Sequence, residues 1–263
     1  MILRFRSIST ILFLSMLVSY SHAQDPFSVR SYQLPGTFSR ITGILIDPVG
    51  KAQVPLLGGI YTPADSSWFI PPRPERYITS YAAFPTDTAL LVISNTEKNT
   101  MIDWIRYRSA KAIQRQELTK MNVGVYQVVK RQDNIFIWGV AKQGSRIGLV
   151  LKDSVGWFFK SNKLIRQVQI DPKGQLYFAA DSMIFNLTKK EKVLANTSSV
   201  YGFDFASDGR IYLTTDEGFG YIEKGKMVIV APELKGYVAC FESLIFVQPQ
   251  SGDQLFEFKR NGK

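Results

Sequence analysis

The sequence predicts an all-β protein, a β-propeller with six four-stranded blades, and three observations lead to it. A unit at residues 165–194 returns thirty-five positions later at residues 202–230. Both copies alternate short apolar runs with turns that contain Gly, Pro or Asp, a pattern typical of short strands joined by hairpins. One such unit cannot bury its own faces, so neighbouring units must stack, as propeller blades of about 40 residues do.

The first unit shows how one blade is built. Val168 and Ile170 alternate with polar residues, which places them on one face of a strand. The turn at 171–174 contains a proline that presets a negative φ and a glycine that accepts a positive one. The run at 176–180 (LYFAA) is apolar enough for a central strand buried on both faces. Short strands around 184–187 and 193–194 complete the four.

Apolar anchors recur at the same place in successive units, with spacings of 45, 41, 35 and 34 residues. They begin at Leu90, Ile135, Leu176, Ile211 and Ile245. The segment 41–50 matches the start of the unit at 165–194 and adds a first blade, which gives six. Seven stays open, because the irregular segment 54–80 has room for another.

Two segments flank the first blade. We expect a strand at Phe27–Leu34 to complete the last blade and close the ring. The segment 66–76 contains three prolines within four residues, which excludes a central strand and favours an extended surface loop.

Residues 1–23 have the pattern of a signal peptide. Arg4 and Arg6 precede an apolar run at 11–18, and Ser21-His22-Ala23 ends in a small-x-small cleavage pattern. The alternative is a membrane anchor, but the run is shorter than the roughly 20 residues that a spanning helix needs. We therefore expect a secreted or periplasmic protein, a single β-propeller domain at 24–263 and no transmembrane segment after cleavage.

Composition excludes several chemistries. The one histidine, His22, is lost with the signal peptide, so the mature chain has no histidine for a catalytic triad, a general base or a zinc site. Cys240 is the single cysteine, so no disulfide forms within the chain, and its apolar neighbours predict a buried, unreactive thiol. The formal net charge of the whole chain is +10. Despite this charge, nucleic acid is a poor partner for an exported protein. We expect a monomer that binds a protein, peptide or glycan and that holds no cofactor or metal.

Carboxylates are the remaining route to catalysis. Five aspartates recur in the two clear units and could hold calcium through oxygen ligands. A residue repeated at equivalent places is more often part of the blade structure, since an active site is built once per ring, and we favour that interpretation. The five are Asp171, Asp181, Asp204, Asp208 and Asp216.

The segment 95–121 is the least blade-like and the most basic, and within it 109–119 is expected to form a helical turn or a long hairpin tip. Arginines beside aromatic residues suit stacking and the pairing of anions. A solvated hairpin is the favoured alternative, with Trp104 packed inward; Trp68 is likewise expected at a blade edge. Six residues are the candidates for a partner-binding surface: Trp68, Arg73, Trp104, Arg106, Tyr107 and Arg108.

The runs IDPKGQLYFAADSMIFNL and DFASDGRIYLTTDEGFGYI resemble blades of the NHL, SMP-30-like and TolB-like superfamily of six-bladed propellers. The resemblance is good over 165–230 and implies the fold. The superfamily includes lactonases that hold a divalent metal in the channel through carboxylate and asparagine side chains, a set that this chain does not match residue by residue. The leading interpretation is therefore a non-catalytic propeller that binds a partner through loops at one end of the ring. The alternative is a metal-dependent hydrolase or lactonase of the SMP-30-like type.

Overall fold

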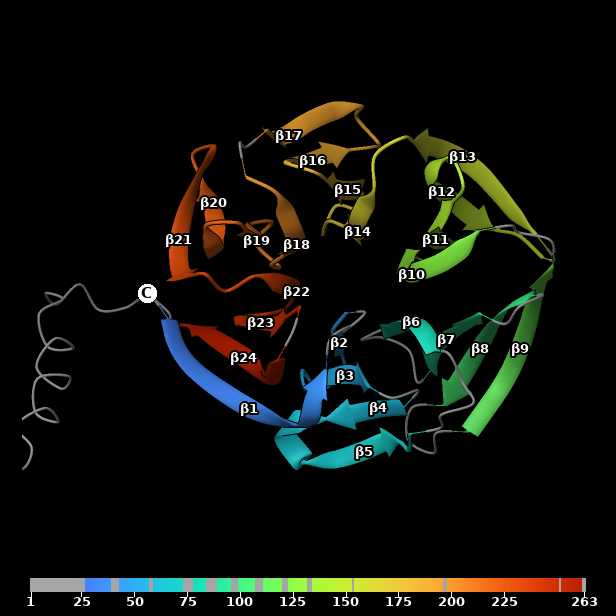
Figure 1. Ribbon diagram of the computed structural model, residues 1–263, viewed down its shortest axis with the longest axis horizontal. Helices are drawn as coiled ribbons and strands as arrows, with labels where there is room; N and C mark the ends of the chain where they lie inside the picture. The colour runs from blue at the N-terminus through green and yellow to red at the C-terminus, as the bar shows by residue number, and fades with distance from the viewer. Residues whose placement is uncertain are drawn as a thin grey trace, which may run out of the picture.

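The computed structural model describes residues 27–38, 43–56, 59–72, 78–83, 89–95, 99–106, 111–119, 123–131, 134–152, 154–195, 198–250 and 252–261. These residues form six four-stranded antiparallel sheets, arranged as blades around a central axis (Figure 1). The prediction of an all-β propeller with six blades is confirmed. The described residues of segment 54–80 belong to blades 1 and 2 rather than to a seventh blade.

In blades 1 to 5 the strands follow one another in chain order from the axis outward. Blade 1 contains β2 (Leu45–Ile46), β3 (Ala52–Leu56), β4 (Gly59–Thr62) and β5 (Ser67–Ile70), with a 3-10 turn at Pro63–Asp65. Blade 2 contains β6 (Ile78–Ala83), β7 (Ala89–Asn95), β8 (Asn99–Arg106) and β9 (Lys111–Thr119). Blade 3 contains β10 (Gly124–Arg131), β11 (Asn134–Ala141), β12 (Gly144–Val150) and β13 (Val155–Ser161).

The second half of the ring repeats this order and then closes it. Blade 4 contains β14 (Ile165–Ile170), β15 (Leu176–Ala180), β16 (Met183–Asn186) and β17 (Glu191–Ala195). Blade 5 contains β18 (Val200–Phe205), β19 (Ile211–Thr215), β20 (Gly218–Glu223) and β21 (Lys226–Pro232). Blade 6 contains β22 (Gly236–Phe241), β23 (Leu244–Pro249), β24 (Gly252–Arg260) and, as its outermost strand, β1 (Phe27–Phe38).

The pairing of β1 with β24 closes the ring of blades. The two strands run antiparallel, with Phe27 opposite Arg260 and Gln33 opposite Gln254. The predicted ring-closing strand is therefore confirmed, and it continues four residues beyond Leu34.

The turns between the first and second strands of the blades follow the sequence prediction. Gly174 and Gly209 have φ angles of 76° and 84°, which a side chain adopts only with strain. Asp171 Oδ1 accepts the backbone N–H of Gln175 at 2.7 Å, and Asp208 Oδ1 accepts that of Arg210 at 3.0 Å. The expected role of these two aspartates in holding turns is thus confirmed.

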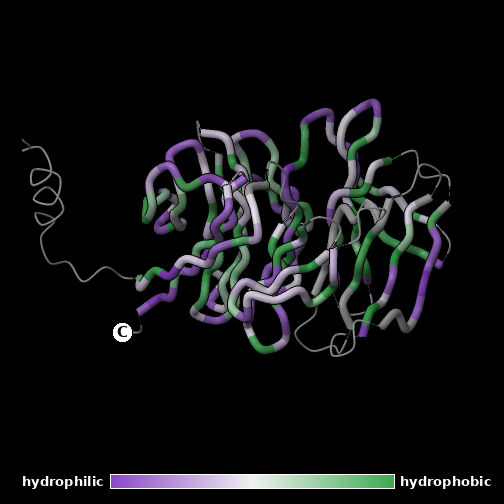
Figure 2. Tube along the Cα trace, turned by 60° about the horizontal axis from the view of Figure 1, so that its bottom comes forward, coloured by the Kyte–Doolittle hydropathy of each residue, from purple (hydrophilic) through white to green (hydrophobic). Residues whose placement is uncertain are grey.

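The hydrophobic core lies between neighbouring blades. Phe203 and Leu213 of blade 5 are fully buried and share one cluster with Ile184 of blade 4. Figure 2 shows the hydrophobic segments mainly along the strands and the hydrophilic ones mainly at turns and rims. Each blade therefore covers the face of the next, as the repeat predicts.

Segment 95–121 supplies β8 and β9 of blade 2, so the helical turn or long hairpin tip expected at 109–119 is wrong. The favoured alternative, a hairpin with Trp104 packed inward, is confirmed. As the outermost strand, β9 has edge positions that face solvent, so charged residues occur within it. Arg115 pairs with the buried Asp103 of β8, with Nε 2.6 Å and Nη2 3.0 Å from the carboxylate oxygens. Arg115 thus supplies hydrogen-bond donors and a positive charge to the buried carboxylate of Asp103.

Among the described residues, none belongs to a helix that is long and apolar enough to span a membrane.

Candidate functional site

The innermost strands carry β-bulges at matching positions. The pairing register shifts between Val125 and Gln127 in β10, between Ile165 and Gln167 in β14, and between Val200 and Gly202 in β18. A bulge leaves one residue unpaired and changes the direction of its side chain. The residues at these positions are Tyr126, Arg166 and Tyr201. In β6 the register also shifts, between Ile78 and Ser80, and the residue there is Thr79.

These bulges lie near one face of the ring. The chain passes between blades there, for example at residues 233–235, and we call this side the connection face. Each innermost strand begins at this face, so its second or third residue lies at the adjacent end of the central channel. Tyr237 is the second residue of β22 and has the corresponding place in blade 6.

A cavity of about 70 Å³ lies at this end of the channel, and we call it the mouth cavity. Blades 1, 3, 4 and 6 contribute its described walls. Its lining residues on the innermost strands of blades 3, 4 and 6 are Tyr126, Gln127, Arg166, Gln167, Gln169 and Tyr237, and Trp138 of β11 lies beside them.

One wall of the mouth cavity is a stacked aromatic pair. The rings of Tyr126 and Trp138 lie 5.4 Å apart at an angle of 14°. Trp138 is buried, whereas Tyr126 is 48% exposed. The Trp138 indole N–H donates to Gln127 Oε1 at 2.8 Å, which fixes the ring below the exposed tyrosine.

Two glutamines join neighbouring blades beneath this wall. Gln127 Oε1 also accepts the backbone N–H of Val168 in blade 4 at 3.0 Å. Gln167, one repeat later, accepts the backbone N–H of Phe203 in blade 5 at 2.9 Å. Because both bonds cross from one innermost strand to the next, they fix the relative positions of the bulged residues.

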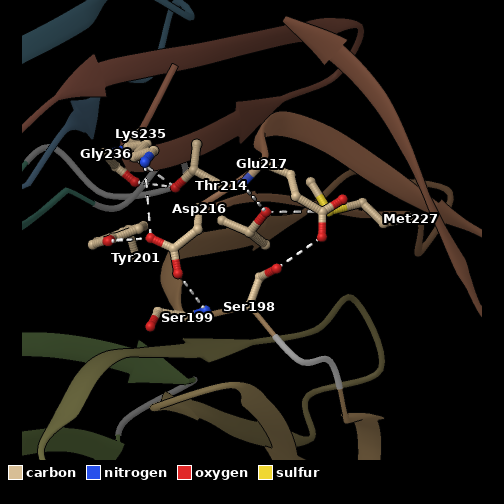
Figure 3. Close-up of polar contacts among 10 residues, drawn as sticks. Ser198, Ser199, Tyr201, Thr214, Asp216, Glu217, Met227, Lys235 and Gly236 are labelled. Carbon is tan, nitrogen blue, oxygen red and sulfur yellow. Dashed lines mark hydrogen bonds and ion pairs between the residues drawn. The ribbon is translucent and has the colours of Figure 1, made fainter. Parts of the chain in front are cut away.

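Arg166 lies over an anchored tyrosine. Its guanidinium carbon is 5.7 Å from the centre of the Tyr201 ring. The Tyr201 hydroxyl donates to Asp216 Oδ1 at 2.6 Å, and Asp216 Oδ2 accepts the Ser199 N–H at 2.9 Å (Figure 3). The bond to Asp216 raises the pKa of Tyr201 and lowers the pKa of the carboxyl group. Asp216, with Lys235 Nζ at 3.8 Å, thus holds the tyrosine on which the arginine rests.

A second carboxylate lies along the same innermost strand. Asp204 Oδ2 accepts the backbone N–H of Cys240 in blade 6 at 2.7 Å, and Oδ1 accepts that of Phe205 at 2.8 Å. Burial raises the pKa of Asp204 to about 7. Burial also raises the pKa of the Cys240 thiol well above its usual value, so the thiol stays protonated at neutral pH and is a poor nucleophile.

Three of the six predicted binding residues are described, and none of these three lines the mouth cavity. Trp68 of β5 packs edge-on against Tyr61 with the ring centres 5.2 Å apart, and Trp104 of β8 packs against a cluster that includes Leu91. Arg106 is exposed at the end of β8. The other three candidates, Arg73, Tyr107 and Arg108, lie outside the described residues. Partner binding by this set stays a prediction.

Sequence reasoning missed Tyr126, Arg166, Tyr201 and Tyr237. The signal was the order of residues at the start of each unit, where VYQV at 125–128 is followed by IRQV, VYGF and GYVA at corresponding places. An apolar residue or glycine is followed in each by tyrosine or arginine. This second repeat lies outside the turn glycines and the central strands on which the blade pattern depends.

Within the described residues, no group of three or more Cys, Asp or Glu side chains is placed to hold a metal ion.

A larger groove of about 690 Å³ lies between the outer strands of blades 5 and 6. Its walls are mainly apolar, with Glu233 as its charged residue, so it offers few groups that could orient a ligand.

No protein-family model and no curated protein sequence matches this chain. Solved structures do match it. A gluconolactonase from Xanthomonas campestris has a TM-score of 0.68 at 10% identity, covering 89% of this chain and 90% of that chain. Streptogramin B lyase has a TM-score of 0.58 at 16% identity, covering 90% and 88%.

A WD40 propeller is also among the matching structures. The WD40 propeller domain of Doa1 has a TM-score of 0.57 at 13% identity, covering 88% of this chain and 97% of that chain. Likeness at such low identity concerns the fold alone. The chain is therefore a six-bladed β-propeller whose structural neighbours include propellers of the gluconolactonase type.

Proposed function

We propose that the protein is an exported, non-catalytic β-propeller that binds a protein partner at the connection face of the ring. One observation carries the proposal: Tyr126, Arg166 and Tyr237 come from three different blades and line one cavity at the end of the channel. Loops and strand ends on a rigid scaffold are where binding residues concentrate.

The chemistry of this surface supports the binding of a protein. The residues that contribute most of the binding energy at protein interfaces are often tryptophan, tyrosine or arginine, and they gather around pockets. Tyr126 is already stacked on Trp138, and Gln127 joins blades 3 and 4. Little side-chain freedom is therefore lost when a partner covers Tyr126, which favours affinity.

Charge and export belong to the same proposal. Without residues 1–23, which contain Arg4 and Arg6, the chain keeps 30 Lys and Arg residues against 22 Asp and Glu residues, and this net charge of +8 favours encounter with acidic surfaces. Residues 1–23 carry the cleavage pattern described above, which would direct the propeller out of the cytoplasm. We also interpret the repeat at 165–230 as that of the NHL, SMP-30-like and TolB-like superfamily.

The alternative of a metal-dependent lactonase requires free carboxylates in the channel. The recurring aspartates with described contacts have structural tasks instead. Asp171 and Asp208 hold turns, Asp204 joins blades 5 and 6, and Asp216 binds Tyr201. Asp181 forms an ion pair with Lys163. These contacts favour the binding interpretation.

Site-specific photo-cross-linking tests the proposal in the cells that make the protein. A photo-reactive amino acid replaces Tyr126 in one variant. In the control variant it replaces Val49, which is 74% exposed in a turn at the other face. We expect an adduct of defined mass from position 126 and none from position 49.

Two results would contradict the proposal. Equal adducts from both positions would mean that contact is not confined to the connection face. Hydrolysis of lactones, together with a melting temperature that rises when calcium is added, would favour the lactonase alternative, since a ligand that binds the native state stabilises it.

A further inference from the structure

The mouth cavity presents hydrogen-bond donors whose capacity is unfilled. Gln127 Oε1 already accepts two N–H groups, from Trp138 and Val168. Since both partners can only donate, the orientation of the amide is fixed, and its Nε2 group is left as a donor. Among the described residues, no hydrogen bond is made by this Nε2 group, by the Gln169 side chain or by the Tyr237 hydroxyl.

Arg166 adds a positive charge to these donors. Within the described part of the chain it makes no ion pair, and its contact is the face of the Tyr201 ring. No described residue lining the cavity is acidic. Burial raises the pKa of Tyr237 and Arg166 opposes that rise, so this hydroxyl also stays protonated and can donate at neutral pH.

The size of the cavity limits what can enter. A cavity of about 150 Å³ holds one benzene molecule, whereas the mouth cavity measures about 70 Å³. It therefore suits a group smaller than a ring. A single guanidinium with neutral donors around it matches a group of one negative charge, and arginine pairs closely with carboxylates.

We infer that the mouth cavity is a carboxylate-binding site centred on Arg166. The carboxylate belongs to the partner, as the side chain of an Asp or Glu residue or as a C-terminal carboxylate. This inference rests on the proposed function and specifies it: the partner inserts one acidic group, and Tyr126 covers the neighbouring chain. A buried carboxylate needs a paired charge and filled hydrogen bonds, and the cavity offers both.

The test uses the mature protein and three short acetylated peptides. One carries an internal glutamate and an amidated C-terminus, the second has glutamine in place of glutamate, and the third has a free C-terminal carboxylate on a chain of glycines. Binding is followed by the NMR signal of the Trp138 indole N–H, which is assigned with a Trp138→Phe variant. This group donates to Gln127 at the wall of the cavity, so it reports on the site itself.

Two arginine variants provide the comparison. Arg166→Gln removes the proposed charge. Arg210→Gln is the matched control, because Arg210 also lies over a tyrosine ring, 5.0 Å from the centre of Tyr221, away from the mouth cavity. Both variants change one exposed or half-buried side chain, and equal melting temperatures show that the fold is retained.

We expect a saturable shift of the Trp138 signal with glutamate or with the free C-terminus and none with glutamine. Arg166→Gln should weaken binding about tenfold or more, as expected for a charged hydrogen bond, and Arg210→Gln should leave it unchanged. The peptide that binds more tightly identifies the source of the carboxylate.

Equal binding of the glutamate and glutamine peptides, or equal affinity of the wild-type protein and Arg166→Gln, would overturn the inference. So would the absence of binding by all three peptides. If position 126 still cross-links to a partner in cells, the binding face stands and the carboxylate alone is wrong. If that adduct is also absent, both the carboxylate site and the proposed function are wrong.

Discussion

Asp204 should make the protein less stable as pH rises from about 4 to about 7. Its carboxylate lies between the innermost strands of blades 5 and 6, where burial raises its pKa from the ordinary 3.8 to about 7. Between these two values the folded protein keeps the proton and the unfolded chain has released it. The free energy of unfolding therefore falls with pH over this range and levels off above it.

The size of the effect follows from the two pKa values. A difference of one unit corresponds to 1.36 kcal/mol, so the change from 3.8 to about 7 amounts to roughly 4 kcal/mol at most. Asp204→Asn removes this titration while keeping the shape of the side chain. Asparagine has one acceptor oxygen for the two backbone N–H groups, so a pH-independent loss of about 1 kcal/mol is also expected.

The assay is urea unfolding of the wild-type protein and Asp204→Asn at pH 4, 5, 6, 7 and 8. The stability of the variant relative to the wild type should increase with pH, and the other titrating groups cancel in the difference. Asp208→Asn is the control, because the pair with Arg260 lowers the pKa of Asp208. The titration of Asp208 therefore lies mostly below pH 4, and the relative stability of this variant should hardly change over the series. Parallel pH curves for the wild type and Asp204→Asn would refute the reasoning.

Two further predictions concern the ring itself. Phe27→Ala should lower the free energy of unfolding by about 3–5 kcal/mol, because this buried ring anchors the closing strand; Val29→Ala, 59% exposed on the same strand, should change it by less than about 0.5 kcal/mol. Gly202→Ala should cost about 1–3 kcal/mol, because its Cβ would lie 2.5 Å from the carbonyl oxygen of Gly236, whereas Gly124→Ala meets only ordinary contacts. Chemical denaturation measures all four, and equal losses within either pair would contradict the assignment.

Blades 4 and 5 were predictable from the sequence because their repeats are nearly regular. Gly174 and Gly209 occupy the same turn position, and the buried strands β15 and β19 follow each at the same distance. The ring-closing strand was predictable too, because an apolar alternating segment precedes the first blade and needs a partner. In each case the local pattern and the ring geometry favour the same structure.

Blade 2 was harder because its outer strands are polar. Charged residues hide the alternation of β9, since only one of its faces packs against the blade. The pair of Arg115 with the buried Asp103 also depends on a contact across twelve residues, which composition does not reveal. The basic composition therefore predicted a helical turn or a long hairpin tip at 109–119, where β9 lies.

The mouth of the channel could not be found from periodicity, because a bulge interrupts the alternation of a strand. Tyr126, Arg166 and Tyr201 each lie at such an interruption. Their side-chain directions depend on the register of the neighbouring strand. Only the spacing of 40, 35 and 36 residues from Tyr126 through Tyr237 pointed to a common role.

The bulge position and the position after it have different tasks. Gln127 and Gln167 follow a bulge and bind the next blade through their side chains. In β18 the residue after the bulge is Gly202, where the backbone of blade 6 approaches too closely for a side chain, and Asp204 makes the bond to blade 6 instead. In blades 3 to 5 another residue makes the hydrogen bond to the next blade, so the bulged residue is not needed for that bond. The bulged residue is tyrosine in blades 3 and 5 and arginine in blade 4. Under the proposed function, this difference reflects the carboxylate that enters the mouth cavity, and Arg166 is therefore the residue to test first.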